Sequence, residues 1–318
     1  MPRIVKFITI LSCMIVLVAC SNDSEETSQI DSSSEEEKET ITITDFSDRT
    51  LEFSEKPEKI VALGNGETDI VYALGESVVG RPSGETPIKE AEEALEVGSS
   101  HSIDLEKLTY LSPDVVLGNF PMNQKDIPSV ENLGAELVLT SANSVDDILK
   151  QITLFGELLD KNDEAEKITS SINDHIEDIK ANSLSSKPRA LLIYFAPGSD
   201  LIALPNSLSG DILEIAGGEN IASQFESLEE YPQYAALNSE RIIDANPEII
   251  FIMSHGNVEE TKESVMKQLS KKSGWEHIDA IKNEQIHFLP KDLFGTNPGT
   301  RITEAIDHMY DLLKDVES

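Results

Sequence analysis

Short apolar runs alternate with longer amphipathic segments along the chain from residue 40 onward. Runs at 41–44 and 50–53 flank a polar turn, which predicts a hairpin of two strands. The later runs are bounded by segments whose apolar residues recur at helical spacing. This alternation predicts an α/β protein with a largely parallel sheet. The further strands are expected at 60–63, 114–117, 136–139, 190–194, 248–252 and 285–288.

A segment of different character separates two series of strands. Ser144 is a plausible N-cap, and apolar residues then recur at helical spacing as far as Leu159. A second stripe runs from Ala165 to Ile179, and helix must end before Pro188. We therefore predict a helical strut joining two lobes. The predicted boundaries are 41–143 for the N-terminal lobe, 144–184 for the linking helices and 185–318 for the C-terminal lobe.

The two predicted lobes resemble each other internally. Residues 104–117 match residues 238–251, each as a helix that ends near a proline and leads into a buried strand. Asp69-Ile70 with Gly75 is echoed by Asp211-Ile212 with Gly217. Any α/β protein can repeat such units by chance, but the shared order and similar offsets favour duplication. We predict two Rossmann-like α/β lobes joined by a long backbone helix, with a ligand cleft between them.

The N-terminus is expected to carry an export signal. Arg3 and Lys6 precede an apolar run that stops at Cys20, and this run is shorter than the roughly 20 residues of a membrane span. Residues 17–20 resemble a bacterial lipobox, which implies removal of residues 1–19 and a lipid on Cys20. An ordinary cleaved signal with an incidental cysteine is the alternative.

Composition narrows the picture further. Residues 20–40 are rich in Ser and Glu, which predicts a disordered acidic tether. The formal net charge of −34 disfavours nucleic-acid binding, which requires a basic surface. The two cysteines, Cys13 and Cys20, both lie in the N-terminal segment, so the mature domain has no disulfide and depends on its core.

Several motifs, taken together and in order, resemble the helical-backbone substrate-binding proteins. These are the receptors of bacterial ABC importers for ferric siderophores, haem and cobalamin. The resemblance covers about residues 40 to 315 and implies two lobes with little hinge movement, delivery of a ligand to a permease, and no catalytic activity. The motifs lie at residues 57–63 with Glu67 and 73–75, and at 111–116, 216–220 and 246–250.

The C-terminal half resembles the haem-receptor lipoproteins of iron-regulated surface determinant systems, at residues 196–199, 209–220, 254–256 and 294–295. That resemblance implies haem as ligand and His255 as one iron ligand. Where those receptors supply a methionine from the first lobe, this chain has His101. Two imidazoles would fill both axial positions of haem iron. A surface-loop histidine without a ligand role is the alternative for each.

Further site residues are expected around the cleft. Arg81 could pair with a haem propionate, and Pro197, Tyr234 and Phe294 could line the pocket; each could equally pack in the core or at the surface. The resemblance also implies that Glu106 and Glu214, one per lobe, dock onto arginines of the permease. Glu67 is a third docking candidate.

Other functions remain open from the sequence. A ferric-siderophore receptor would need converging cations, and few Lys or Arg lie near the predicted cleft, which favours haem. Cobalamin would need no histidine. A surface haem-modifying enzyme would leave one iron position open, and the sequence has no Gly-x-Ser-x-Gly, P-loop or His-Glu-x-x-His motif. We expect a monomer on the outer face of the cell membrane, anchored through Cys20.

Overall fold

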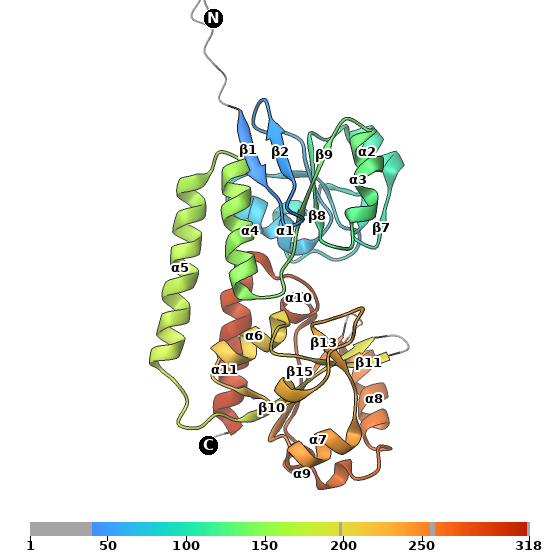
Figure 1. Cartoon of the computed structure of the whole chain (residues 1–318), viewed down its shortest axis with the longest axis vertical. Coiled ribbons are helices and arrows are strands. Elements are labelled where there is room, and N and C mark those ends of the chain that lie inside the picture. Colours follow the sequence, from blue (N-terminus) through green and yellow to red (C-terminus); the bar gives the residue numbers. More distant parts are fainter. Residues whose placement is uncertain (1–39, 197–198, 255–257, 317–318) are drawn as a thin grey trace, which may run out of the picture. The chain divides into compact units, whose positions relative to one another are not determined.

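The computed structural model describes residues 40–196, 199–254 and 258–316 (Figure 1). Residues 38–318 form one compact unit. The predictions for residues 1–39, which include Cys20, lie outside the described residues, as do those for Pro197 and His255. Within the described parts of the chain, no helix is both long enough and apolar enough to cross a membrane.

The N-terminal lobe contains a five-stranded sheet in the order β5-β4-β3-β8-β9, with every neighbouring pair parallel. The strands are β3 (Ile60–Ala62), β4 (Val78–Arg81), β5 (Leu95–Glu96), β8 (Val115–Asn119) and β9 (Glu136–Thr140). The helices are α1 (Asn65–Ala73), α2 (Leu105–Leu111) and α3 (Ile127–Glu131). The predicted hairpin is confirmed as β1 (Ile41–Thr44) and β2 (Thr50–Phe53).

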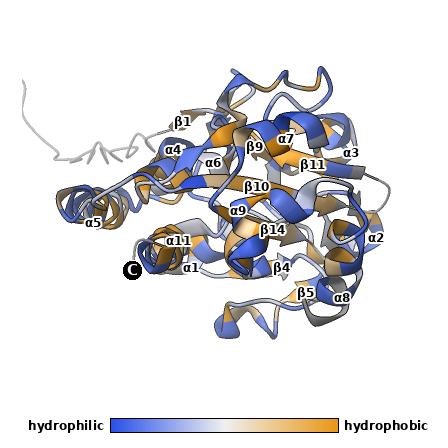
Figure 2. Ribbon diagram, turned by 90° about the horizontal axis from the view of Figure 1, so that it is seen from below, coloured by the Kyte–Doolittle hydropathy of each residue, from blue (hydrophilic) through white to orange (hydrophobic). Residues whose placement is uncertain are grey.

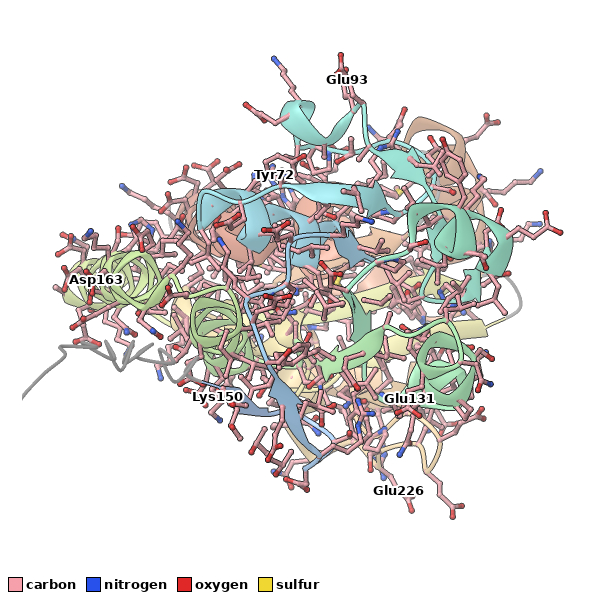
Figure 3. The ribbon with its side chains drawn as sticks, turned by 90° about the horizontal axis from the view of Figure 1, so that it is seen from above. Tyr72, Glu93, Glu131, Lys150, Asp163 and Glu226 are labelled. Atoms are coloured by element: carbon pink, nitrogen blue, oxygen red, sulfur yellow. The ribbon has the colours of Figure 1, made fainter. Side chains whose placement is uncertain are left out.

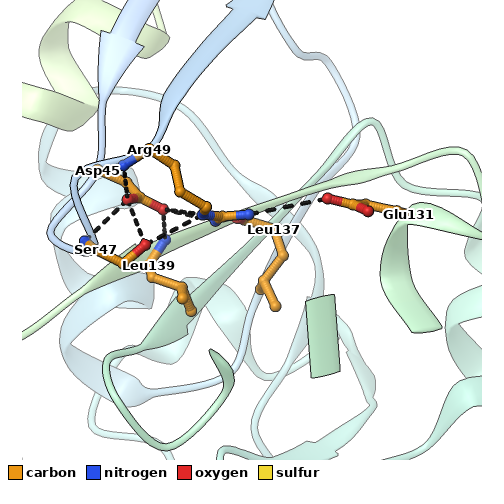
Figure 4. Close-up of polar contacts among 6 residues, drawn as sticks. All are labelled: Asp45, Ser47, Arg49, Glu131, Leu137 and Leu139. Carbon is orange, nitrogen blue, oxygen red and sulfur yellow. Dashed lines mark hydrogen bonds and ion pairs between the residues drawn. The ribbon is translucent and has the colours of Figure 1, made fainter. Parts of the chain in front are cut away.

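A buried carboxylate holds the turn between β1 and β2 against the sheet (Figure 4). Asp45 accepts hydrogen bonds from Ser47 Oγ at 2.7 Å and from Arg49 Nη2 at 2.6 Å. It also accepts one from the backbone N–H of Leu139 in β9 at 3.3 Å. Burial alone would raise the pKa of Asp45, but the hydrogen bonds from Ser47 and Arg49 outweigh it and lower that pKa.

The C-terminal lobe contains a six-stranded sheet in the order β13-β11-β10-β14-β15, and β12 pairs with the first part of β10. The strands are β10 (Arg189–Ala196), β11 (Ser199–Ala203), β12 (Glu219–Asn220), β13 (Tyr234–Ala236), β14 (Ile249–Ser254) and β15 (Ile286–Phe288). The helices are α6 (Leu208–Ile215), α7 (Ser239–Ala245), α8 (Val258–Leu269), α9 (Asp279–Lys282), α10 (Lys291–Phe294) and α11 (Ile302–Val316). β11 and β13 are antiparallel additions that the sequence pattern did not predict.

The lobes repeat one unit. In each, a central strand (β3 or β10) pairs in parallel with the strand that follows the first helix (β4 or β12) and with the strand after the next helix (β8 or β14). Asp104 caps α2 and Asn238 caps α7. Both helices end on a left-handed residue, Ser112 with φ 48° and Asn246 with φ 44°. The matched caps and strand order agree with the predicted duplication.

Two helices connect the lobes. α4 (Val145–Leu158) begins at the predicted N-cap, where Ser144 Oγ accepts a hydrogen bond from the backbone N–H of Asp147. α5 (Asn162–Ala181) follows after a turn in which Asp160 has φ 52°. The two helices pack side by side (Figure 1). The expected strut is therefore a helical pair rather than one continuous rod.

Apolar side chains from both lobes meet in a shared core. Successive side chains of each central strand point to opposite faces of its sheet. In β10, Leu192 faces the shared core, whereas Leu191 faces a second apolar cluster under α7 and α8. The strands β10 and β14 are mostly hydrophobic (Figure 2). Charged side chains such as Glu93 and Glu226 point away from the unit (Figure 3). The apolar strands of both lobes thus share one core, and the charged side chains remain at the surface.

Candidate functional site

His101 stands at the tip of a small hairpin made by β6 (Gly98–Ser99) and β7 (Ser102–Ile103). The His101 side chain is exposed. Gly98 has φ 95°, and a Cβ there would lie 2.2 Å from the carbonyl oxygen of Ser102, so the tight hairpin requires glycine. The sequence predicted His101 on a loop before a helix, and the structure places it there.

Asn123, which was not identified from the sequence, connects this hairpin to the end of β8 and so acts as its brace. Its side chain is fully buried. Its Nδ2 donates to the carbonyl oxygen of Ser100 at 2.9 Å and to Asp126 Oδ2 at 2.9 Å. Its Oδ1 accepts from the backbone N–H of Asn119 at the end of β8, also at 2.9 Å. A buried polar side chain with every bond satisfied fixes the hairpin relative to the sheet.

A pocket of about 530 Å³ lies beside the hairpin, at the start of α2. It is confined to the N-terminal lobe and is lined by the following residues: Ser83, Gly98, Ser102, Ile103, Asp104, Leu105, Glu106 and Lys107. Ser83 ties this wall to the hairpin, because its N–H donates to the carbonyl oxygen of Gly98 at 2.6 Å. The pocket borders His101's hairpin, whereas the position of a ligand between the lobes remains a prediction.

Arg81 is buried at the end of β4 and is already bonded within its own lobe. Its Nη1 donates to the carbonyl oxygens of Pro82 at 2.9 Å and Gly84 at 2.8 Å, and its Nη2 donates to Glu96 at 3.0 Å. A buried cation is costly unless it is paired in this way. The structure therefore gives Arg81 partners within its own lobe, and its pairing with a propionate remains a prediction.

The two described aromatic candidates differ in exposure. Tyr234 is half-buried on β13, and its ring lies 5.8 Å from the ring of Tyr194 on β10. Burial raises the pKa of Tyr234, and burial together with Tyr234 raises that of Tyr194 to about 12. Phe294 is only 7 % exposed and belongs to the shared core beside His308. Phe294 thus packs as a core residue, while Tyr234 keeps a partly accessible surface.

The three glutamates that are candidates for docking to the permease differ in exposure and in their position in the repeat. Glu106 and Glu214 are both exposed, on α2 and α6. However, the structural repeat matches α2 with α7, so the counterpart of Glu106 is the exposed Glu240 in the first turn of α7. Glu67 is 5 % exposed and cannot reach a partner protein, so the suggestion that it docks is corrected.

Glu67 instead belongs to a buried polar cluster between α1, α4 and the C-terminal segment. Gln151 Nε2 donates to Glu67 Oε1 at 3.3 Å and to Thr140 Oγ1 at 2.6 Å, and Gln151 Oε1 accepts from Asn297 Nδ2 at 2.8 Å. Burial raises the pKa of Glu67, and the hydrogen bonds from its own backbone N–H and Gln151 lower it less. This cluster ties sequence segments from both lobes together.

The comparison with known protein families agrees with this two-lobed architecture. A family model described as Periplasmic binding protein matches residues 60–293. The chain belongs to this family. It is a substrate-binding protein of the ABC-importer type, and the family consists of binding proteins rather than enzymes.

Individual relatives extend the match to nearly the whole chain. The high-affinity heme uptake system protein IsdE of Staphylococcus aureus is 25% identical over 314 residues, which is 98% of each chain. The crystal structure of S. aureus IsdE complexed with heme aligns with a TM-score of 0.71 and 27% identity, covering 80% of this chain and 98% of that one. An ABC transporter substrate-binding protein from Listeria monocytogenes aligns with a TM-score of 0.73 and 29% identity, over 82% and 100% of the chains.

Proteins with other ligands share the fold. The siderophore-binding protein BauB is 19% identical with a TM-score of 0.70. The vitamin B12 binding protein BtuF of Vibrio cholerae is 18% identical with a TM-score of 0.66. At this identity the likeness concerns the fold alone.

Proposed function

We propose that this protein is a lipid-anchored extracytoplasmic receptor that binds haem and delivers it to an ABC permease. His101 and His255 are its two axial iron ligands. The single observation that carries the proposal is the exposed imidazole of His101 on a hairpin braced by Asn123. The whole-chain similarity to a heme uptake protein supports haem as the ligand.

The braced hairpin suits an axial ligand. An imidazole held on a rigid support loses little freedom when it binds iron, so more of the bond strength remains as affinity. His255 directly follows β14, at the carboxyl end of a parallel strand, which is where open α/β sheets bind ligands. Two neutral imidazoles would close both axial positions, which suits carriage rather than chemistry on the iron.

Delivery needs an anchor and a docking surface. Cys20 would carry the lipid, and residues 20–40 would hold the receptor away from the membrane. Glu106 and Glu240 form a repeat-matched pair of exposed carboxylates that would bind arginines on the two halves of a permease. Glu214 lies on a different element of the repeat and serves as the comparison variant: transport should fall for Glu106→Ala and Glu240→Ala more than for Glu214→Ala.

The test of ligand identity is a haemin titration of the full chain followed by absorption. A saturable one-to-one transition to a sharp, low-spin, six-coordinate spectrum is expected. His101→Ala and His255→Ala should each give a high-spin or five-coordinate spectrum. His277→Ala is the matched control, because the His277 side chain is 76 % exposed and lies in η4 (Trp275–His277), away from the hairpin.

A spectrum no different from that of haemin with an inert protein would overturn the haem assignment. The ferric-siderophore assignment would then take its place, tested by quenching of Trp275 fluorescence with a ferric catecholate, and cobalamin would be tested in the same way. Conversion of bound haem into a degraded product would contradict a carrier role altogether.

A further inference from the structure

Two aspartates at matching positions of the repeat make contacts beyond their own lobes: Asp69 with the C-terminal lobe, and Asp211 with the linking helix α4, which packs on β1 of the N-terminal lobe. Asp69 lies in α1, and its Oδ2 accepts from the backbone N–H of Thr300 at 2.6 Å and from Thr300 Oγ1 at 2.7 Å. Asp211 lies in α6, and its Oδ2 accepts from the backbone N–H of Val145 at 2.7 Å. Both aspartates are half-buried, and burial raises the pKa of each carboxyl.

The two contacts run crosswise. Val145 is the first residue of α4, which follows β9, the last strand of the N-terminal lobe. Thr300 lies in η5 (Gly299–Arg301), which leads into α11 after β15, the last strand of the C-terminal lobe. Each duplicated helix therefore places its aspartate at the start of the helical segment that follows the last strand of the other lobe.

The chemistry of these contacts is that of helix capping. The first N–H groups of a helix have no partner within it, and a carboxylate satisfies them and interacts favourably with the helix dipole. Asp211 does not serve its own helix in this way, because Ser207 Oγ already caps α6 by accepting from the N–H of Gly210 at 3.1 Å. Gly299 permits the other contact: a Cβ there would lie 2.5 Å from Asp69 Oδ2.

We propose that Asp69 and Asp211 are a coupled pair of interlobe clasps, which together set the opening between the lobes and break together when the lobes separate. Gln151 lies in α4, the helix whose first N–H is bonded to Asp211, and it is bonded to Glu67 of α1 and to Asn297 near η5, so α4 is held at both contacts. The inference concerns the protein without ligand and does not depend on which ligand it carries.

The repeat supplies a matched pair of control residues. Asp114 Oδ2 accepts from the N–H groups of Glu58 at 2.9 Å and Lys59 at 2.8 Å, all within the N-terminal lobe. Its counterpart Glu248 accepts from the N–H of Arg189 at 2.8 Å within the C-terminal lobe. These carboxylates make bonds of the same kind and length as the clasps, but they do not connect the lobes.

Amide hydrogen exchange of the ligand-free full chain tests the coupling. Asp69→Ala should speed exchange at the distant amide of Val145, and Asp211→Ala should speed exchange at the distant amide of Thr300, each by about 5- to 30-fold. One rigid opening that breaks both clasps predicts this, because loss of either clasp lowers the free energy of the shared opening. Asp114→Ala and Glu248→Ala should leave both amides unchanged.

Acceleration only at the amide that lost its own acceptor would overturn the proposal, because it would show two independent local contacts. Trp275 is buried in the C-terminal lobe, so its fluorescence reports whether each variant remains folded. If Asp69→Ala does not fold, Thr300→Ala removes one donor while keeping both carboxylates. It should then speed exchange at Val145 by about two- to tenfold, and no change there would equally overturn the coupling.

Discussion

The two lobes share a scaffold and differ where the ligand is proposed to bind. Both have a central strand flanked by parallel neighbours, capped helices that end on a left-handed residue, and a carboxylate bonded to the start of the central strand. The N-terminal lobe adds the braced hairpin of His101, whereas the C-terminal lobe adds β11 and β13. The repeated positions maintain the architecture, whereas the hairpin that carries His101 departs from the repeat.

A core substitution at matched positions should have the largest effect. Leu117 in β8 and Phe251 in β14 are both fully buried and occupy equivalent positions. Leu117→Ala should lower the free energy of unfolding by about 2–5 kcal/mol and Phe251→Ala by about 3–5 kcal/mol, since each leaves a cavity. Urea unfolding measures both. A loss below 1 kcal/mol in only one lobe would contradict equal structural roles; Tyr110→Ala, 81 % exposed, is the surface control.

Asp45 distinguishes the lobes, because its turn has no repeat counterpart in the C-terminal lobe. Asp45→Asn should lower the free energy of unfolding by about 1–3 kcal/mol at neutral pH, since donors of Ser47, Arg49 and Leu139 lose a buried carboxylate acceptor.

The loss of unfolding free energy in Asp45→Asn should depend on pH, and the pKa of Asp45 gives the direction of that dependence. The folded-state pKa of Asp45 is lowered, so its stabilising contribution is present above the ordinary Asp pKa and is lost as pH falls through the folded-state value. The gap in unfolding free energy between the wild type and Asp45→Asn should therefore narrow below about pH 4. A gap that stays constant between neutral pH and pH 3 would show that the charge of Asp45 is not the cause.

The smallest changes in stability are expected at Ser112 and Asn246, which occupy matched positions in the two lobes, and the two changes should have opposite signs. Ser112→Gly should stabilise by about 0.5–1 kcal/mol, because glycine adopts positive φ without the cost of a Cβ. Asn246→Gly should destabilise by about 1 kcal/mol, because Asn246 exchanges hydrogen bonds with the side chain and N–H of Asp279 at 2.7 and 2.8 Å. Thermal unfolding of both variants measures the difference, and equal shifts would contradict this account.

The sequence predicted much of the scaffold. The apolar runs located β1 and β2 to the residue, and Ser144 correctly marked the start of α4. The repeat was visible because its proline, caps and apolar strand recur in order. Antiparallel β11 and β13 were missed because strands of five and three residues are too short to show a periodic pattern.

The candidate site was less predictable. The sequence placed His101 on a loop, but it could not identify Asn123 as the brace, because that role depends on a contact with Ser100, distant in sequence. Arg81 and Glu67 were expected at functional surfaces and prove to be buried, with partners supplied by the fold. Charged residue types alone do not reveal whether folding leaves them exposed.

The central claim is that His101 binds the haem iron, and the reduction potential of the haem-loaded chain tests it most directly. A thioether favours reduced iron relative to an imidazole, so His101→Met should raise the potential while the spectrum remains low-spin and six-coordinate. His277→Met should leave it unchanged. An unchanged potential in His101→Met, with haem still bound, would show that His101 is not a ligand and would contradict the proposed site.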